Sequence, residues 1–250
     1  MSTAPLALVT GGKRRLGAAI ATRLAEAGYA LALVSHLDKE PEAELLNVLN
    51  EQDSEWHPFV ADLGNPENAA PLIASVSAHF GRVPDLLVNN AAMFGQDDWT
   101  SMDAKSLEAH FRLNTFAPLL LSQALVKAAK SQVAIVHVTD QRTDNPPVDQ
   151  ISYTLSKQAL AASVRTMAKA FGAKARVNAV APGLVIVTDD YAPGQAERLA
   201  SMMPLNALPD PQGVADAVLY LAGARHVTGQ TLFVDGGAHL ESFNRDFIHL

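Results

Sequence analysis

Cysteine is absent from the 250 residues, and aromatic residues make up only 6% of them. Without thiols the chain has no disulfide framework, no cysteine nucleophile and no cysteine-ligated zinc site. No apolar run approaches the roughly 20 residues that a membrane-spanning helix needs, and residues 1–5 carry no charged leader. These absences predict a soluble, cytoplasmic protein without a membrane partner.

Positive charge is also scarce, since 19 Lys and Arg face 26 Asp and Glu for a net charge of −7. The longest basic run is the triplet at residues 13–15, which is too short for a nucleic-acid surface. None of the eight histidines pairs with another at the i, i+3 or i+4 spacing of a metal-binding helix face. We therefore expect a small-molecule substrate, no nucleic acid and no metal.

Short β-rich runs alternate with longer amphipathic segments along the chain. Strands are predicted at 6–10, 30–35, 56–60, 85–89, 133–139, 176–180 and 231–234, and helices at 16–27, 41–51, 67–80, 114–129, 153–171 and 211–221. Near-continuous apolar strands between helices are typical of a parallel sheet covered on both faces. No linker or repeat interrupts the pattern, so we expect one α/β domain over 1–250, a Rossmann-type doubly wound sheet of about seven strands.

A glycine-bearing turn follows the first strand and opens an Ala-rich helix. Gly11 lets the backbone approach a pyrophosphate, and the N–H groups near Leu16 at the helix N-terminus attract it. Three consecutive cations, Lys13, Arg14 and Arg15, would repel one another unless anions lie nearby, so we predict that they face phosphate. A solvated basic turn is the alternative.

The end of the second strand indicates which nicotinamide cofactor binds, because a carboxylate there would hold the ribose hydroxyls of NAD. Ser35 and His36 stand there instead, with Arg14 nearby, and this combination favours the 2′-phosphate of NADPH. Asp38 is near enough to keep NADH open. Asp62, which closes the third strand, is predicted to accept from the adenine amino group, with a helix cap or a turn role as the alternative.

The carboxyl ends of parallel strands meet at one edge of a doubly wound sheet, where ligands bind. Cofactor contacts are therefore predicted at residues that end or follow strands. These are Gly11, Leu63, Asn90, Ala91, Pro182 and Gly183. Such residue types are also common in ordinary loops, so position alone leaves a structural role open.

Tyr153 and Lys157 lie four residues apart, and hence on one face of a helix, one turn from each other. An ammonium beside a phenol favours phenolate and is expected to lower the pKa of Tyr153 toward the range of proton exchange. The pair predicts proton transfer that accompanies hydride transfer.

With these motifs the chain resembles the short-chain dehydrogenase/reductases over almost its whole length. The resemblance rests on the first turn, Asn89-Asn90-Ala91-Ala92, Asn114, the Tyr153/Lys157 pair and Pro182-Gly183. It implies that Tyr153 is the proton donor and that Lys157 binds the nicotinamide ribose and tunes Tyr153. It also implies that Asn114 helps hold a water in a proton relay, and that the protein is a homotetramer.

Two residues depart from the general pattern of that family. Arg15 stands where the middle glycine of the first turn is usual, and Asp140 stands where a serine is usual. Both departures resemble the pteridine reductase and dihydromonapterin reductase branch, in which an aromatic at the position of Phe94 stacks on the pterin. The resemblance implies Arg15, Phe94, Asp140 and Tyr153 as substrate contacts.

The chemistry of a carboxylate supports this branch, because an ionised Asp140 would oppose the alkoxide that forms when a ketone is reduced. An imine nitrogen instead accepts a proton, which an acid/base carboxylate coupled to Tyr153 through water could assist. Alternatively, Asp140 only caps the loop at 140–150, while Thr139 or Gln141 supplies the hydrogen bond.

Three functions follow as hypotheses. The first is an NADPH-dependent reductase of a dihydropterin or dihydrofolate C=N bond. The second is a general carbonyl reductase of ketones or oxoacyl thioesters that tolerates Asp140. The third is a noncatalytic NADP-binding protein, against which the complete set of Asn114, Tyr153 and Lys157 argues, since binding alone needs no proton donor.

Two later segments are expected near the substrate. Residues 184–201 are largely polar and, by their place in the family, are expected to form a mobile lid. The tail, residues 241–250, carries Phe243, Phe247, Ile248 and Leu250. It is apolar enough to dock on a neighbouring subunit or to fold back on its own.

Overall fold

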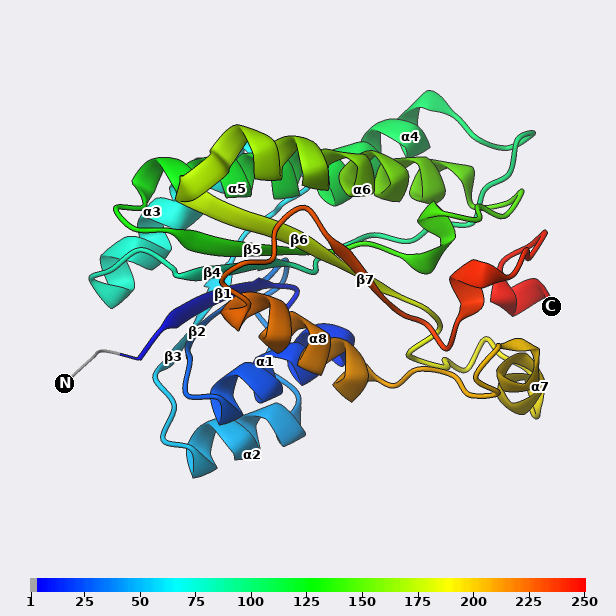
Figure 1. The fold of residues 1–250 in the computed structure, drawn as a ribbon, viewed down its shortest axis with the longest axis horizontal. Coiled ribbons are helices and arrows are strands. Elements are labelled where there is room, and N and C mark those ends of the chain that lie inside the picture. Colours follow the sequence, from blue (N-terminus) through cyan, green and yellow to red (C-terminus); the bar gives the residue numbers. More distant parts are fainter. Residues whose placement is uncertain (1–3) are drawn as a thin grey trace.

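The computed structural model describes residues 4–250, which form a three-layer α/β structure (Figure 1). Seven parallel strands form a sheet in the order β3-β2-β1-β4-β5-β6-β7. They are β1 (Leu6–Thr10), β2 (Ala30–Ser35), β3 (Trp56–Val60), β4 (Leu86–Asn89), β5 (Val133–Val138), β6 (Ala175–Pro182) and β7 (Thr231–Val234). The predicted doubly wound fold is confirmed, with a strand at each predicted place.

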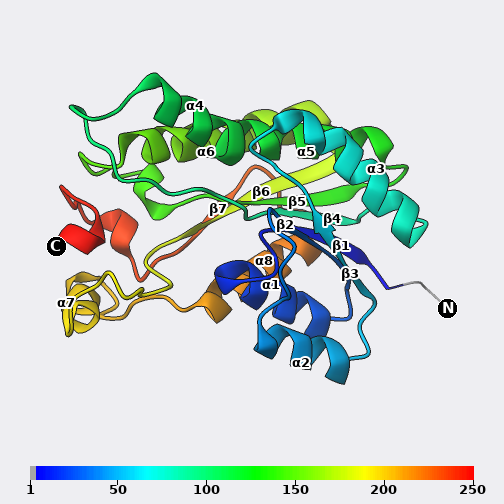
Figure 2. The ribbon, with the colours of Figure 1, turned by 180° about the vertical axis from the view of Figure 1, so that it is seen from behind.

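Helices cover both faces of the sheet (Figures 1 and 2). On one face lie α3 (Ala69–Phe80), α4 (Ala104–Phe111), α5 (Ala117–Ala128) and α6 (Ile151–Phe171), and on the other α1 (Arg15–Glu26), α2 (Ala43–Glu51) and α8 (Pro211–Gly223). A further helix, α7 (Gln195–Met202), lies beside the C-terminal segment. Across residues 4–250, no helix combines the length and apolarity needed to cross a membrane.

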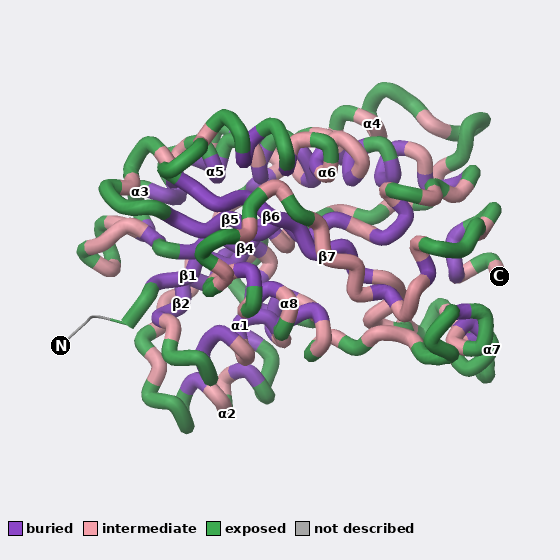
Figure 3. The backbone as a smooth tube through the Cα atoms, in the orientation of Figure 1, coloured by how far each residue is buried: buried purple, intermediate pink, exposed green. Residues whose placement is uncertain are grey.

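The core explains why the strands are apolar throughout. Leu6 and Leu8 of β1 pack into the core on the α3, α5 and α6 side, whereas Ala7 and Val9 pack on the α1, α2 and α8 side. All four side chains are fully buried, and Figure 3 shows the central strands buried along their length. Because both faces are covered, alternation with polar residues is lost.

Two helices were not predicted. Helix α4 follows the cap residue Asp103, whose carboxylate accepts from the Ser106 N–H at 2.7 Å, a cap that the sequence signals. It continues through a wider π-helical turn, Arg112–Phe116, into α5, so the predicted helix over 114–129 is the second half of a longer one. Helix α7 occupies the end of the predicted lid.

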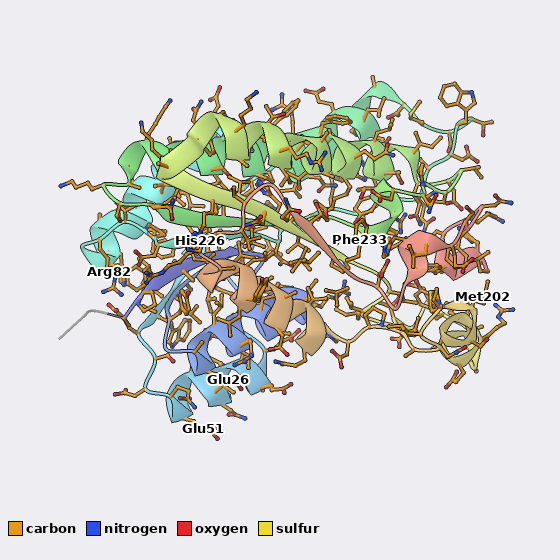
Figure 4. The ribbon with its side chains drawn as sticks, viewed as in Figure 1. Glu26, Glu51, Arg82, Met202, His226 and Phe233 are labelled. Carbon is orange, nitrogen blue, oxygen red and sulfur yellow. The ribbon has the colours of Figure 1, made fainter. Side chains whose placement is uncertain are left out.

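The carboxyl edge of the sheet is the place for a ligand. Strand β1 pairs with both β2 and β4, so the strand order reverses there and opens a crevice at the carboxyl ends. Figure 4 shows Arg82, which precedes β4, at one end of the molecule and Met202 of α7 at the opposite end. The lid and the C-terminal segment therefore gather at the edge where the crevice opens.

Candidate active site

A groove of about 800 Å³ lies at the carboxyl ends of β1, β2 and β4. Its walls include most of the predicted cofactor contacts, namely Gly11, Arg14, Arg15, Leu16, Ser35, His36, Asp62, Leu63, Asn90 and Ala91. The structure thus brings together residues from four separate parts of the sequence.

The turn after β1 is shaped for close approach by a ligand. Gly11 has a φ of +64°, which favours glycine. A methyl group on Gly17 would collide with the Gly11 carbonyl oxygen and come 2.7 Å from Asn90 Nδ2. That amide donates to the Thr10 carbonyl at 2.9 Å and fixes the turn. This cradle at the N-terminus of α1 fits a pyrophosphate.

The basic triplet is divided. Arg14 and Arg15 line the groove, but Lys13 does not, so the prediction that Lys13 faces phosphate is wrong. The Lys13 ammonium is buried and donates to the Lys39 carbonyl at 2.9 Å, an arrangement that offsets its desolvation. Pro182 is the last residue of β6 and is buried, and it does not line the groove either.

The far end of the groove carries Ser35, His36 and Asp62. Asp62 Oδ1 accepts from the Gly64 N–H at 2.9 Å and lies 3.5 Å from His36 Nδ1. Asp62 therefore has the turn role that the sequence left open. Asp38 is exposed and does not line the groove, so the carboxylate that kept NADH open is absent from its wall.

A second cavity of about 690 Å³ adjoins the groove, because Arg15 and Ile186 line both. Phe94, Asp140 and Gly183 contribute to its wall. Part of the predicted lid and part of the C-terminal segment close it, through Leu184, Ile186, Thr188, Asp189, Asp190, Tyr191, Asp246, Phe247 and Ile248. The implied substrate contacts Arg15, Phe94 and Asp140 thus share one cavity.

Asp140 binds Tyr153 directly. The Tyr153 hydroxyl donates to Asp140 Oδ2 at 2.8 Å, and the Phe94 ring lies edge-on to Tyr153 with centroids 4.8 Å apart. The other oxygen, Asp140 Oδ1, accepts from the Arg142 N–H at 3.0 Å and caps a short 3₁₀ turn. Asp140 therefore caps the turn with one oxygen and faces Tyr153 with the other.

The pKa of Tyr153 shifts in the direction opposite to the one expected. Burial and the neighbouring Asp140 carboxylate raise the pKa of Tyr153 well above its ordinary range. Lys157 lies with Nζ 5.9 Å from the centre of the Tyr153 ring and donates to the Val138 carbonyl at 2.8 Å. The expected lowering of the pKa of Tyr153 is therefore not found in this structure, and the phenol stays protonated.

Burial acts on Lys157 as well. The side chain is 3% exposed, and burial lowers the pKa of Lys157 to about 8, against the opposite effect of Asp140. The ammonium beside Tyr153 is therefore sensitive to pH near neutrality.

Asn114 lies in the π-helical turn and is buried. Its Oδ1 accepts from the Met93 N–H at 2.9 Å, and its Nδ2 donates to the Met93 carbonyl and to Ser156 Oγ, both at 3.0 Å. The side chain therefore clamps the loop before Phe94 to helix α6, a role that the sequence did not reveal.

The C-terminal segment folds back on its own subunit. Phe247 and Leu250 pack with Leu199 and Met203 at α7. Gln195 Nε2 donates to the Phe247 carbonyl at 3.0 Å. Of the two placements left open for the tail, the structure shows this one.

Comparisons with known proteins agree with the fold and the site. The family model described as Enoyl-(Acyl carrier protein) reductase matches residues 11–239. A ketoacyl reductase assigned to the granaticin polyketide synthase of Streptomyces violaceoruber is 33% identical, with 95% of this chain and 97% of that protein covered. Pteridine reductase 1 of Leishmania tarentolae is 30% identical, with 95% and 97% covered.

Among solved structures, FolM Alternative dihydrofolate reductase 1 from Brucella canis, complexed with NADP, superposes with a TM-score of 0.85. The two sequences are 32% identical, and 95% of each chain is covered. In residues 4–250, no group of three or more His, Asp or Glu side chains could hold a metal ion. With the sheet, the glycine turn and the Tyr153/Lys157 pair, these matches show that the chain belongs to the short-chain dehydrogenase/reductase family of oxidoreductases.

Proposed function

We propose that the protein is an NADPH-dependent reductase that acts on the C=N bond of a dihydropterin or dihydrofolate. The observation that carries this proposal is the 2.8 Å hydrogen bond from the Tyr153 hydroxyl to Asp140. It puts a carboxylate where ketone reduction would develop negative charge, so the site favours a substrate atom that gains a proton.

The cofactor assignment draws on the groove and on the neighbouring structure. Arg14, Ser35 and His36 line its outer end and suit a 2′-phosphate, while the glycine cradle suits the pyrophosphate. The Brucella canis protein was crystallised with NADP. NADPH, when bound here, supplies the hydride.

The residues of the chain supply the proton. As hydride reaches carbon, Tyr153 gives its hydroxyl proton to the adjacent nitrogen. A phenolate facing an ionised Asp140 at 2.8 Å is disfavoured. The step balances when solvent returns a proton to Tyr153 as its own proton leaves for the nitrogen.

Phe94 offers the flat pterin ring a surface on which to stack. Its side chain is 51% exposed, although it lines the substrate cavity and contacts Tyr153. An exposed aromatic beside a proton donor suits a planar, electron-poor heterocycle that stacks on it. The relatives named a pteridine reductase and an alternative dihydrofolate reductase support this substrate class.

A carbonyl reductase is the second candidate, because the ketoacyl reductase relative is 33% identical over nearly the whole chain. In that case Asp140 would be tolerated, with its structural role as the cap of the 3₁₀ turn.

The experiment that tests the proposal is NADPH oxidation by purified protein with dihydromonapterin, dihydrobiopterin and dihydrofolate. Small ketones and an acetoacetyl thioester serve as the competing panel, and NADH as the cofactor control. Turnover of pterins alone is the expected result. Turnover of carbonyls alone would overturn the pterin assignment and favour the second candidate.

A further inference from the structure

Asp140 is held by a buried arginine that the reaction itself does not use. The Arg142 side chain is 8% exposed, and its Nε donates to Asp140 Oδ1 at 3.1 Å. Its guanidinium carbon lies 5.1 Å from the centre of the Tyr153 ring and 5.5 Å from that of Phe94. Arg142 thus contacts the carboxylate, the proton donor and the aromatic wall at once.

The opposite end of the guanidinium reaches the C-terminal segment. Arg142 Nη2 donates to Asp246 Oδ2 at 2.6 Å, and Nη1 donates to Gln150 Oε1. The Asp246 carboxylate is 5% exposed. Its backbone N–H is in turn bound by the Asp149 carboxylate at 2.9 and 3.2 Å. A residue 106 positions along the chain from the catalytic carboxylate therefore shares one cation with it.

The electrostatics of this chain of contacts demand both partners. A buried guanidinium that loses one carboxylate keeps the full cost of its own desolvation. The other carboxylate must then offset that cost alone. Burial on its own would lower the pKa of Arg142, but Asp140, Tyr153 and Asp246 outweigh it and raise that pKa. Arg142 stays charged, and removing Asp246 would leave Asp140 as its single carboxylate partner.

We propose that Arg142 and Asp246 are positioning residues through which the C-terminal segment fixes Asp140 against Tyr153. Neither residue gives or takes a proton in the reaction. Arg142 orients Asp140 by binding Oδ1, so that Oδ2 faces the Tyr153 hydroxyl. Asp246 fixes Arg142 from the opposite side. The inference rests on the proposed function only in taking Asp140 and Tyr153 as the reacting pair.

The test compares Asp246→Asn with Glu241→Gln, the matched loss of an exposed carboxylate on the same segment. Asp246→Asn is expected to lower kcat by roughly tenfold or more, because a misplaced catalytic group loses most of its effect. The KM for NADPH should not change, since Asp246 does not line the cofactor groove. Asp246→Glu should restore part of kcat, and Glu241→Gln should leave kcat unchanged.

A double-variant cycle separates positioning from a general structural effect. In an Asp140→Ser background, Asp246→Asn should cost nothing further, because the group that it positions is gone. An equal loss of kcat in the natural and the Asp140→Ser backgrounds would overturn the proposal. So would the absence of any loss in the natural background. Circular dichroism of each variant checks that the fold is kept.

Failure of the proposed function is distinguishable from failure of this inference. If carbonyls but not pterins are turned over, the substrate assignment has failed, and the contact between Arg142 and Asp246 is then tested without turnover. A readout without turnover is the nuclear magnetic resonance signal of the Arg142 Nε–H, assigned with Arg142→Lys. Its exchange with solvent should accelerate in Asp246→Asn but not in Glu241→Gln, and unchanged exchange would contradict the proposal.

Discussion

At the scale of single residues, the site differs from a simple Tyr/Lys pair in the charge that faces the phenol. Asp140 accepts the Tyr153 proton at 2.8 Å, while Lys157 is turned toward the Val138 carbonyl. The sequence could single out Tyr153, Lys157 and Asp140 as candidates, because residue type and spacing carry the resemblance. It could not give the pKa of Tyr153, which depends on burial and on where each carboxylate oxygen points.

Arg142 and Asp246 escaped prediction for a related reason. Arg142 follows Asp140 by two residues, which is a visible signal, but its second carboxylate comes from the C-terminal segment. No local pattern links positions so far apart in the chain, and the apolar residues of the tail do not point to Asp246.

Tyr153→Phe removes the phenol proton with almost no change in shape. We expect kcat to fall by roughly 100- to 10,000-fold, the range of general acid catalysis. NADPH affinity should be nearly unchanged, because Tyr153 does not line the groove. Steady-state kinetics measure kcat, and fluorescence titration measures the affinity for NADPH. Retained turnover would remove Tyr153 from the mechanism.

The pKa of Lys157 predicts how the activity falls at alkaline pH. Its pKa of about 8 means that kcat/KM should fall as the pH rises through about 8, when the ammonium loses its charge. His137, with a pKa lowered to about 3 by burial, and Tyr153, with a pKa well above its ordinary range, do not titrate there. A flat pH profile between 7 and 9 would contradict this assignment.

Unfolding is not the cause of that expected loss. The pKa of Lys157 falls from 10.5 to about 8 on burial, so the unfolded chain binds more protons between these pH values. By linkage, this group makes the free energy of unfolding rise with pH in that window. Thermal melts at each pH serve as the control, and activity should fall without a matching fall in the melting temperature on this account.

At the scale of elements, the turn between β1 and α1 and the helix pair α4–α5 set the two walls of the site. The first was predicted well, because glycine, the helix start and the strand end are local signals. The second was not, because the π-helical turn that places Asn114 against Met93 depends on packing with α6. Wide turns of this kind recur at functional sites.

Gly17→Ala tests the cradle. The added methyl would collide with the Gly11 carbonyl, so NADPH affinity should fall and unfolding free energy should drop by about 1–3 kcal/mol. Gly223→Ala at the end of α8 is the matched control, because its methyl would meet no atom within 4 Å. Isothermal calorimetry and denaturant melts report both quantities, and equal behaviour of the two variants would argue against a cradle.

At the scale of the whole molecule, strand order decides where the site forms. The apolar strands and the helices between them predicted the parallel sheet, because a sheet that helices cover on both faces needs apolar residues along its whole strands. The meeting of the C-terminal segment with the 3₁₀ turn after β5 arises only from the assembled tertiary structure. That is why the lining of the second cavity was predicted less completely than that of the groove.

The expected homotetramer is a prediction at this scale. Phe116 and Leu120 lie four residues apart at the start of α5 and are 44% and 39% exposed, and Leu155 of α6 is 42% exposed. Exposed apolar side chains of this kind suit contact between subunits. Light scattering should give a tetramer for the natural chain and a smaller species for Leu120→Glu, with Lys127→Glu as a control. A monomeric natural chain would contradict the prediction.

The measurement closest to the central claim is the specificity ratio of kcat/KM for a dihydropterin to kcat/KM for a ketone, in the natural chain and in Asp140→Ser. The serine variant keeps Tyr153 and Lys157 but replaces the carboxylate with the hydroxyl that is usual in the family. We predict that pterin reduction falls by roughly tenfold or more while ketone reduction stays equal or improves. Pterin reduction that survives unchanged in Asp140→Ser would show that the Tyr153–Asp140 pair does not carry the reaction.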